Sequence, residues 1–288
     1  MSAAVHLVVT LVVCACLVTP LANARWVVRS PRTGILLWQM LASTWVLSIV
    51  GLLLSVGLAR FPGSIPSGLA SWSREWAHWG TVSVMAGLGL GGWLIGAVVW
   101  SWLAVLRVRR RHRDVLALVA HEHCDVPGAV IVDSPLTVAY CLPGVRATVV
   151  LSSGAVRALP RAELLAVLAH ERAHVRERHD LVLLPFTALR WCAPARLAAS
   201  VRDVVALLVE MRADETACRE HGAGHLASAL RRFHAASPPA GALGVADTKI
   251  EARLSRLAGS APLAPVWRWL SLLSGMVLVS TPVSFVLY

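Results

Sequence analysis

Four long apolar segments separate the polar stretches of this chain. They cover about residues 4–22, 34–59, 81–106 and 266–288. Each is close to the roughly 20 apolar residues that an α-helix needs to cross the hydrocarbon core of a bilayer. The pattern predicts a mainly α membrane protein with four transmembrane helices, three within residues 1–106 and the fourth at residues 266–288.

The first apolar segment can also be interpreted as a cleaved signal peptide. The residues Leu-Ala-Asn-Ala before Arg25 resemble a cleavage site. However, the segment has no basic start, and Arg25, Arg29 and Arg32 follow it closely. We expect a retained helix, because the basic residues along the chain then agree with one orientation.

The hydrophobic pattern changes within residues 107–265, the stretch long enough for a folded aqueous domain. Short β-branched runs at residues 129–132 and 147–151 predict strands. After Pro160, apolar residues recur with the spacing of a helix that buries one face, and residues 195–220 predict a second long helix. We therefore expect an α+β domain with a small β-sheet.

Composition supports a membrane protein and argues against nucleic-acid binding. Hydrophobic residues make up 57% of the chain and the mean hydropathy is +0.65, whereas soluble proteins have about 45–50% apolar residues. The net charge of +11 comes almost entirely from arginine. No nucleic-acid-binding motif accompanies these arginines, so we expect no direct contact with nucleic acid. The six cysteines form no CxxC pair, which argues against a disulfide scaffold.

The arginines predict how the chain is oriented in the bilayer. Three of them follow the first apolar segment, and five follow the third: Arg107, Arg109, Arg110, Arg111 and Arg113. Basic residues are enriched in cytoplasmic loops. We therefore expect a multi-pass protein of the cell membrane, with residues 107–265 in the cytoplasm and both termini outside it.

The motif His170-Glu171-Arg172-Ala173-His174 lies in the first predicted helix of this domain. Residues four apart share one helix face, so the two imidazoles can bind one zinc ion at about 2.0–2.1 Å. Glu171 lies one position round the helix, where it can hold a water molecule without binding the metal. Zinc lowers the pKa of such a water towards 7, and the glutamate can take its proton. The motif predicts a zinc hydrolase with Glu171 as its general base.

Catalytic zinc usually has three protein ligands. A third histidine at the spacing of the metzincins is absent, because residues 177 and 180 are Glu and Asp. Glu210 on the second long helix is therefore the predicted third ligand. Asp214, four residues later on the same face, is expected to accept the outer N–H of a ligand histidine.

Weaker signals leave several alternatives open. The acidic and basic residues around the motif could merely pair on a solvated helix face. His121 and His123 could indicate a second metal site, but they are two residues apart on an expected helix, where their rings diverge, so we favour a solvated face. Asp180 can either support the site or cap the next segment. Arg253 can stabilise an oxyanion or contact substrate, or be a surface arginine.

Two motifs carry a family resemblance. Leu-Ala-His170-Glu-Arg-Ala-His174-Val with Glu210-Met-Arg-Ala-Asp214 is similar to the gluzincin group of membrane metallopeptidases. The Pro143-Gly144 turn and the layout of three spans before the domain and one after it resemble peptidase family M56, the BlaR/MecR type. The related family M48, which includes HtpX and the CAAX prenyl proteases, shares the zinc motifs but arranges its spans differently.

The resemblance implies a zinc endopeptidase that acts on a cytoplasmic or membrane protein. In the antibiotic-sensing relatives a penicillin-binding sensor follows the last span, and signalling leads to loss of a DNA-bound repressor. Here we expect the peptidase core without that sensor, with a BlaI-like repressor as a candidate substrate. The alternatives are an HtpX-like quality-control protease and a signalling scaffold without catalysis. We expect a peptide substrate to pair with an edge strand at residues 147–151.

Overall fold

The computed structural model describes residues 2–61, 63–74, 79–122, 129–142, 148–191, 195–236, 243–259 and 261–287. The chain forms two compact units, the first made of Met1–Val99 with Pro262–Tyr288 and the second of Trp100–Ala261. Helix α5 (Thr81–Val119) contributes residues to both units. The Pro143-Gly144 turn that contributes to the family resemblance lies outside the described residues.

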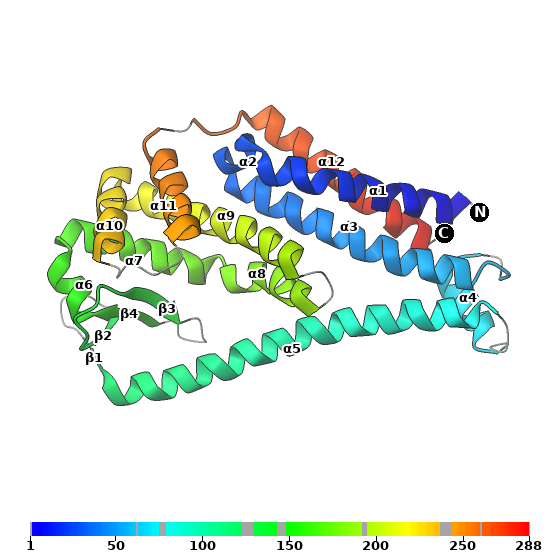
Figure 1. Ribbon diagram of the computed structural model, residues 1–288, viewed down its shortest axis with the longest axis horizontal. Coiled ribbons are helices and arrows are strands. Elements are labelled where there is room, and N and C mark those ends of the chain that lie inside the picture. The colour runs from blue at the N-terminus through cyan, green and yellow to red at the C-terminus, as the bar shows by residue number, and fades with distance from the viewer. Residues whose placement is uncertain are drawn as a thin grey trace. The chain divides into compact units, whose positions relative to one another are not determined.

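The regular elements of the first unit are all helices among its described residues. Its elements are α1 (Ser2–Asn23), α2 (Arg25–Arg29), α3 (Pro31–Gly57), α4 (Ile65–Trp72), the start of α5, and α12 (Pro265–Leu287). Helix α3 packs against both α1 and α12 (Figure 1). At the second contact a glycine, Gly275, allows close approach, since a Cβ atom there would lie 2.6 Å from Sδ of Met40.

Four helices of the chain are long and apolar enough to cross a membrane. They are Ala3–Asn23, Pro31–Gly57, Thr81–Leu118 and Pro265–Ser284. Only 11% to 33% of the residues in their most apolar windows are buried. A soluble protein does not expose so much contiguous apolar surface, so these helices indicate a membrane protein.

The second unit is α+β. After the end of α5 it contains the sheet and then α6 (Ser153–Ala158), α7 (Arg161–Arg176), α8 (His179–Ala188), the short 3-10 helix η1 (Leu189–Trp191), α9 (Ala195–His221), α10 (Ala223–Ala236) and α11 (Leu243–Leu257). Helix α7 lies between the sheet and helices α9 and α10 (Figure 1). Helix α7 has apolar residues on two faces, so it can be buried on both sides in this central position.

The sheet has four strands among the described residues, in the order β1-β2-β4-β3. They are β1 (Ala120–Glu122), β2 (Ala129–Val132), β3 (Ala139–Leu142) and β4 (Thr148–Ser152). Strands β2 and β4 are parallel, and the other two pairs are antiparallel. The two runs that the sequence predicted as strands are therefore β2 and β4.

Two sequence expectations about this sheet are wrong. His121 lies in strand β1 rather than in a helix, because the antiparallel pairing with β2 extends to Ala120. The run that includes Val149 and Leu151 is not an edge strand, because β4 pairs with β2 on one side and β3 on the other. A continuous apolar run is typical of a strand buried on both faces, and Val149, Val150 and Leu151 are 3%, 1% and 0% exposed.

Candidate metal centre

Small side chains allow the helices that carry the predicted ligands to approach closely. Ala169 on α7 and Ala217 on α9 pack in one buried cluster, and α7 contacts α9. Ala173 and Ala213, one turn along each helix, are fully buried. Since an alanine side chain is a single methyl group, the helix axes can lie close enough for short polar side chains to meet.

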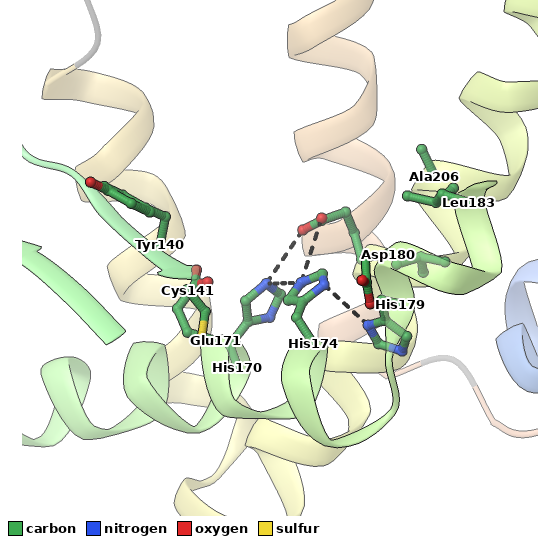
Figure 2. A pocket seen from close by; sticks show the side chains of 11 residues that line it. Tyr140, Cys141, His170, Glu171, His174, His179, Asp180, Leu183 and Ala206 are labelled. Atoms are coloured by element: carbon green, nitrogen blue, oxygen red, sulfur yellow. Dashed lines mark hydrogen bonds and ion pairs between the residues drawn. The ribbon is translucent and has the colours of Figure 1, made fainter. Parts of the chain in front are cut away.

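Three predicted ligands converge at this contact. The Nε2 atoms of His170 and His174 on α7 are 3.1 Å apart. Glu210 on α9 places Oε2 3.3 Å from Nε2 of His170 and Oε1 3.6 Å from Nε2 of His174. One ligand atom from each residue lies within 4.8 Å of the others. Figure 2 shows the two imidazoles side by side on the helix.

The donor set fits a zinc ion. Two nitrogens bound to one tetrahedral ion at about 2.0–2.1 Å lie roughly 3.3 Å apart. The three separations among His170, His174 and Glu210 are 3.1, 3.3 and 3.6 Å. Two imidazoles and a carboxylate are also the ligand types of many catalytic zinc sites. The residues present therefore match the metal that the sequence predicted.

Asp214 lies behind the first histidine, where the sequence analysis expected it. Its side chain is 1% exposed, and Oδ1 lies 3.0 Å from Nδ1 of His170. Nδ1 of His170 is buried and makes no regular hydrogen bond among the contacts described, but Oδ1 of Asp214 is close enough for an ion pair. The contact is thus a close ion pair that orients the ring so that Nε2 faces Glu210.

Arg253 on α11 has a role that the sequence analysis did not assign to it. Nε and Nη2 donate to Asp214 at 2.8 and 2.7 Å, and Nη1 lies 3.0 Å from Oε2 of Glu210. Its side chain is 12% exposed, which excludes the surface-arginine interpretation. All three nitrogens of the guanidinium group contact carboxylates of the site.

A third histidine, which the sequence analysis gave no role, touches the site. Nδ1 of His179 lies 3.1 Å from Nδ1 of His174, and His179 is 3% exposed. Arg178 has a left-handed backbone with φ of 49°, which ends α7 and turns the chain so that α8 begins beside it. Asp180, in the first turn of α8, pairs with Arg109 at 2.8 Å.

Glu171 lines a cleft of about 320 Å³ beside the three candidate ligands. The wall of the cleft consists of Tyr140, Cys141, His170, Glu171, His174, His179, Asp180, Leu183, Ala206, Val209 and Glu210. Tyr140 and Cys141 belong to strand β3, which runs next to α7 (Figure 2). The site therefore lies between an outer strand and the two helices of the zinc motif.

Burial and neighbouring charges shift the pKa values of four side chains of the site. Burial raises the pKa of Glu171 to about 7, and the charge of Glu210 adds to this effect. Burial lowers the pKa of His174 to about 4. Burial disfavours a charged His170 too, but Asp214 and Glu210 raise its pKa to about 9. Despite burial, contact with His170 lowers the pKa of Glu210 to about 2.

With these pKa values, a metal cation that enters the site would have to displace one proton, that of His170. At pH 7 the metal-free protein keeps a proton on His170, between the two carboxylates. His174 is neutral and can offer a nitrogen lone pair, and Glu210 is ionised. A general base works best with a pKa near the working pH, and Glu171 meets that condition.

Comparison with known proteins supports a peptidase. Residues 105–210 match the family model described as peptidase family M48. The matched stretch contains the histidine motif and ends at Glu210. Neither the curated proteins nor the solved structures gave a significant match. The match does not confirm the predicted assignment to family M56.

Family M48 peptidases are zinc metalloproteases, so the match and the geometry of the three ligands support the same chemistry. Of the candidate membrane helices, only Thr81–Leu118 overlaps the start of the matched stretch, and the other three lie outside it. The chain thus has four helices that suggest a membrane protein, is similar to peptidase family M48 over residues 105–210, and has a His-His-Glu group placed to hold a metal ion.

Proposed function

We propose that this protein is a membrane-embedded, zinc-dependent endopeptidase that hydrolyses peptide bonds of a cytoplasmic or membrane protein. The observation that carries the proposal is the convergence of His170, His174 and Glu210 beside Glu171 in one cleft. His170, His174 and Glu210 would hold the ion. When bound, zinc supplies Lewis acidity that activates water and polarises a carbonyl group.

Glu171 is the residue that moves the proton. Its raised pKa, about 7, lets it accept a proton from a water molecule at neutral pH. The same carboxyl group can then give the proton to the leaving amine. The backbone N–H of Cys141 on β3 donates to this carboxylate, which fixes its position next to the strand.

Strand β3 is the element best placed to bind an extended peptide. It pairs with β4 on one side, and among the described residues no strand pairs with its other side. Its residues Tyr140 and Cys141 line the cleft. A substrate segment added to this edge would gain main-chain hydrogen bonds beside the ligands. This assignment replaces the strand that the sequence analysis expected to bind substrate.

Replacing the proton carrier tests the proposal. Glu171→Gln should keep one zinc ion per chain by elemental analysis and lose proteolysis by about 10²- to 10⁴-fold, the usual contribution of a general base. Glu220→Gln is the matched control, because Glu220 is exposed and pairs only at the surface with Arg176. Unchanged cleavage by the Glu171 variant would refute the mechanism.

The same variant separates the possible physiological roles. The first proposed role is regulated proteolysis of one target, with a BlaI-like repressor as candidate. The second is quality control of membrane proteins, which the similarity to family M48 favours. Capture by Glu171→Gln of a single repressor supports the first role, and capture of many membrane-protein fragments supports the second. A zinc-loaded wild-type protein without any proteolysis would instead indicate a signalling scaffold.

We also propose that the peptidase unit faces the cytoplasm, with both termini outside. The support is the arginine cluster that begins at Arg107, directly after the apolar part of α5. Alkaline phosphatase fused after Tyr288 should be active, and the same reporter fused after Arg113 should be inactive. The reverse pattern would place the cleft on the outer side.

A further inference from the structure

Helices α9 and α11 meet through side chains of opposite charge. Three basic residues repeat along one face of α11, and each contacts an acidic residue or the backbone of α9. Lys249 pairs with Asp203 at 2.9 Å. Arg256 contacts Glu215 and, at 3.3 Å, the carbonyl oxygen of Met211. Arg253 lies between these two and is the one that contacts residues of the metal site.

Arg253 divides its donors between two carboxylates with different tasks. Two nitrogens hold both oxygens of Asp214, at 2.8 and 2.7 Å. The third lies 3.0 Å from Oε2 of Glu210, the oxygen that also lies 3.3 Å from Nε2 of His170. A planar guanidinium can bind two acceptor groups in fixed directions, which an ammonium group cannot do. One side chain thereby sets the relative positions of Glu210 and Asp214.

Such a residue is useful to the site because the other contacts described for Glu210 are to His170 and His174, at 3.3 and 3.6 Å, which become its fellow ligands when a metal binds. The side chain of Glu210 is 38% exposed, and a glutamate loses considerable rotamer freedom when it is fixed. Glu210 also lies near the carboxylate of Glu171, whose pKa its charge raises. Arg253 offsets that repulsion, since its charge lowers the pKa of both carboxyl groups.

We propose that Arg253 is a positioning residue of the metal centre: supplied by α11, it holds Glu210 as a ligand and Asp214 as the partner of His170. The inference rests on the metal site of the proposed function and deepens it. It predicts that the loss of one guanidinium weakens zinc binding although no ligand is removed. It also assigns α11, which lies beyond the stretch matched by the family model, to the functional unit.

Zinc affinity of the full-length protein in detergent, measured by competition with a chelator, tests this role. Arg253→Gln should weaken zinc binding about 10- to 100-fold, the usual effect of losing a residue that orients ligands. Arg253→Lys should fall between this variant and the wild type, because it keeps the charge but not the fork of donors. Lys249→Gln and Arg256→Gln are the matched controls, since the contacts described for these two residues join α11 to Asp203, Met211 and Glu215 of α9 and involve neither Glu210 nor Asp214.

Each outcome is decisive. Affinity of Arg253→Gln within twofold of the wild type would overturn the inference, and an unchanged KM with reduced zinc occupancy would support it. Normal affinity with a raised KM would instead make Arg253 a substrate contact. An equal loss in Arg256→Gln would mean that docking of α11 as a whole matters. If Arg253→Gln does not fold, Arg253→Lys decides by the same criterion. A wild-type protein that binds no zinc would refute the proposed function itself, a result distinct from these.

Discussion

Two buried hydroxyl groups in the unit of apolar helices, those of Thr10 and Thr44, bond to their own helix, whereas the most buried carboxylate of the metal site contacts two other helices. Thr10 donates to the carbonyl of His6, and Thr44 to that of Met40, both at 2.8 Å. By contrast, Asp214 on α9 contacts a histidine of α7 and an arginine of α11. Polar groups of the first kind are locally satisfied, but those of the second kind depend on one another.

The strongest test of this contrast removes a member of the coupled set. Asp214→Ala leaves the buried Arg253 and His170 without their shared carboxylate, so we expect a loss of about 3–5 kcal/mol in unfolding free energy, together with weaker zinc binding. Chemical unfolding in detergent measures the first effect. The control is Asp203→Ala, which removes a 45% exposed carboxylate paired with Lys249 and should cost at most about 1 kcal/mol. Equal losses would contradict the contrast.

A second test uses the proton held in the metal-free site. Zinc needs a neutral imidazole, and the pKa of His170 is raised to about 9, while His174 and Glu210 have already lost their protons above about pH 4. Affinity for zinc should therefore rise about tenfold per pH unit from pH 5 to 8 and level off near pH 9. Calorimetry in buffers of different ionisation enthalpy should show release of at least about one proton at pH 7, the one from His170, because Glu171, with a pKa of about 7, adds a fraction of a proton. Affinity that does not change between pH 6 and 8 would exclude a protonated His170.

The third test addresses the packing of the apolar unit, where a glycine allows two segments of backbone to approach closely. A Cβ atom at Gly57 would lie 2.7 Å from the backbone nitrogen of Val84 and 2.8 Å from the carbonyl oxygen of Gly80. Gly57→Ala should lower stability by about 1–3 kcal/mol, because backbone atoms cannot move aside easily. Gly92→Ala, with nothing within 4 Å of the new atom, is the control and should be neutral or slightly stabilising. Thermal unfolding in detergent distinguishes the two.

The smallest effect is expected for a buried hydroxyl of the same unit. Thr44 is fully buried, yet its hydroxyl bonds only within its own helix in the contacts described. Thr44→Val keeps the shape of the side chain and removes one hydrogen bond to the carbonyl of Met40, which also accepts a backbone hydrogen bond of the helix. The free energy of unfolding should therefore fall by about 0.6 kcal/mol or less. A loss above about 2 kcal/mol would show that this unit also contains a coupled polar network.

The parts of the site that the sequence could predict follow from local periodicity. His170 and His174 are four residues apart on a helix, and so are Glu210 and Asp214, so each pair shares a face wherever the helices pack. The four apolar segments were also predictable, because length and hydropathy alone identify candidate spans. Strand β2 coincides with the predicted run because β-branched residues next to one another are a local signal of a strand.

The parts that could not be predicted depend on contacts between distant segments. Arg253 reaches Asp214 across 39 residues, and no local pattern marks which arginine of α11 does so. His179 meets His174 because the left-handed residue Arg178 turns the chain, and an arginine does not signal such a turn. The edge of the sheet was misplaced because strand order is decided by pairing with β3, whose four residues have no clear strand pattern.

The side of β3 that pairs with no strand among the described residues has a consequence for the selectivity of the proposed peptidase. The four residues of β3 offer main-chain N–H and C=O groups, and every peptide has the same groups to pair with them. Binding through these groups therefore depends on the extended conformation of the substrate and not on the identity of its side chains. A segment within a stable helix already uses its own amides and carbonyls and has to unwind before it can bind. Local unfolding free energy of the target, more than a consensus around the scissile bond, would then decide which chains are cut.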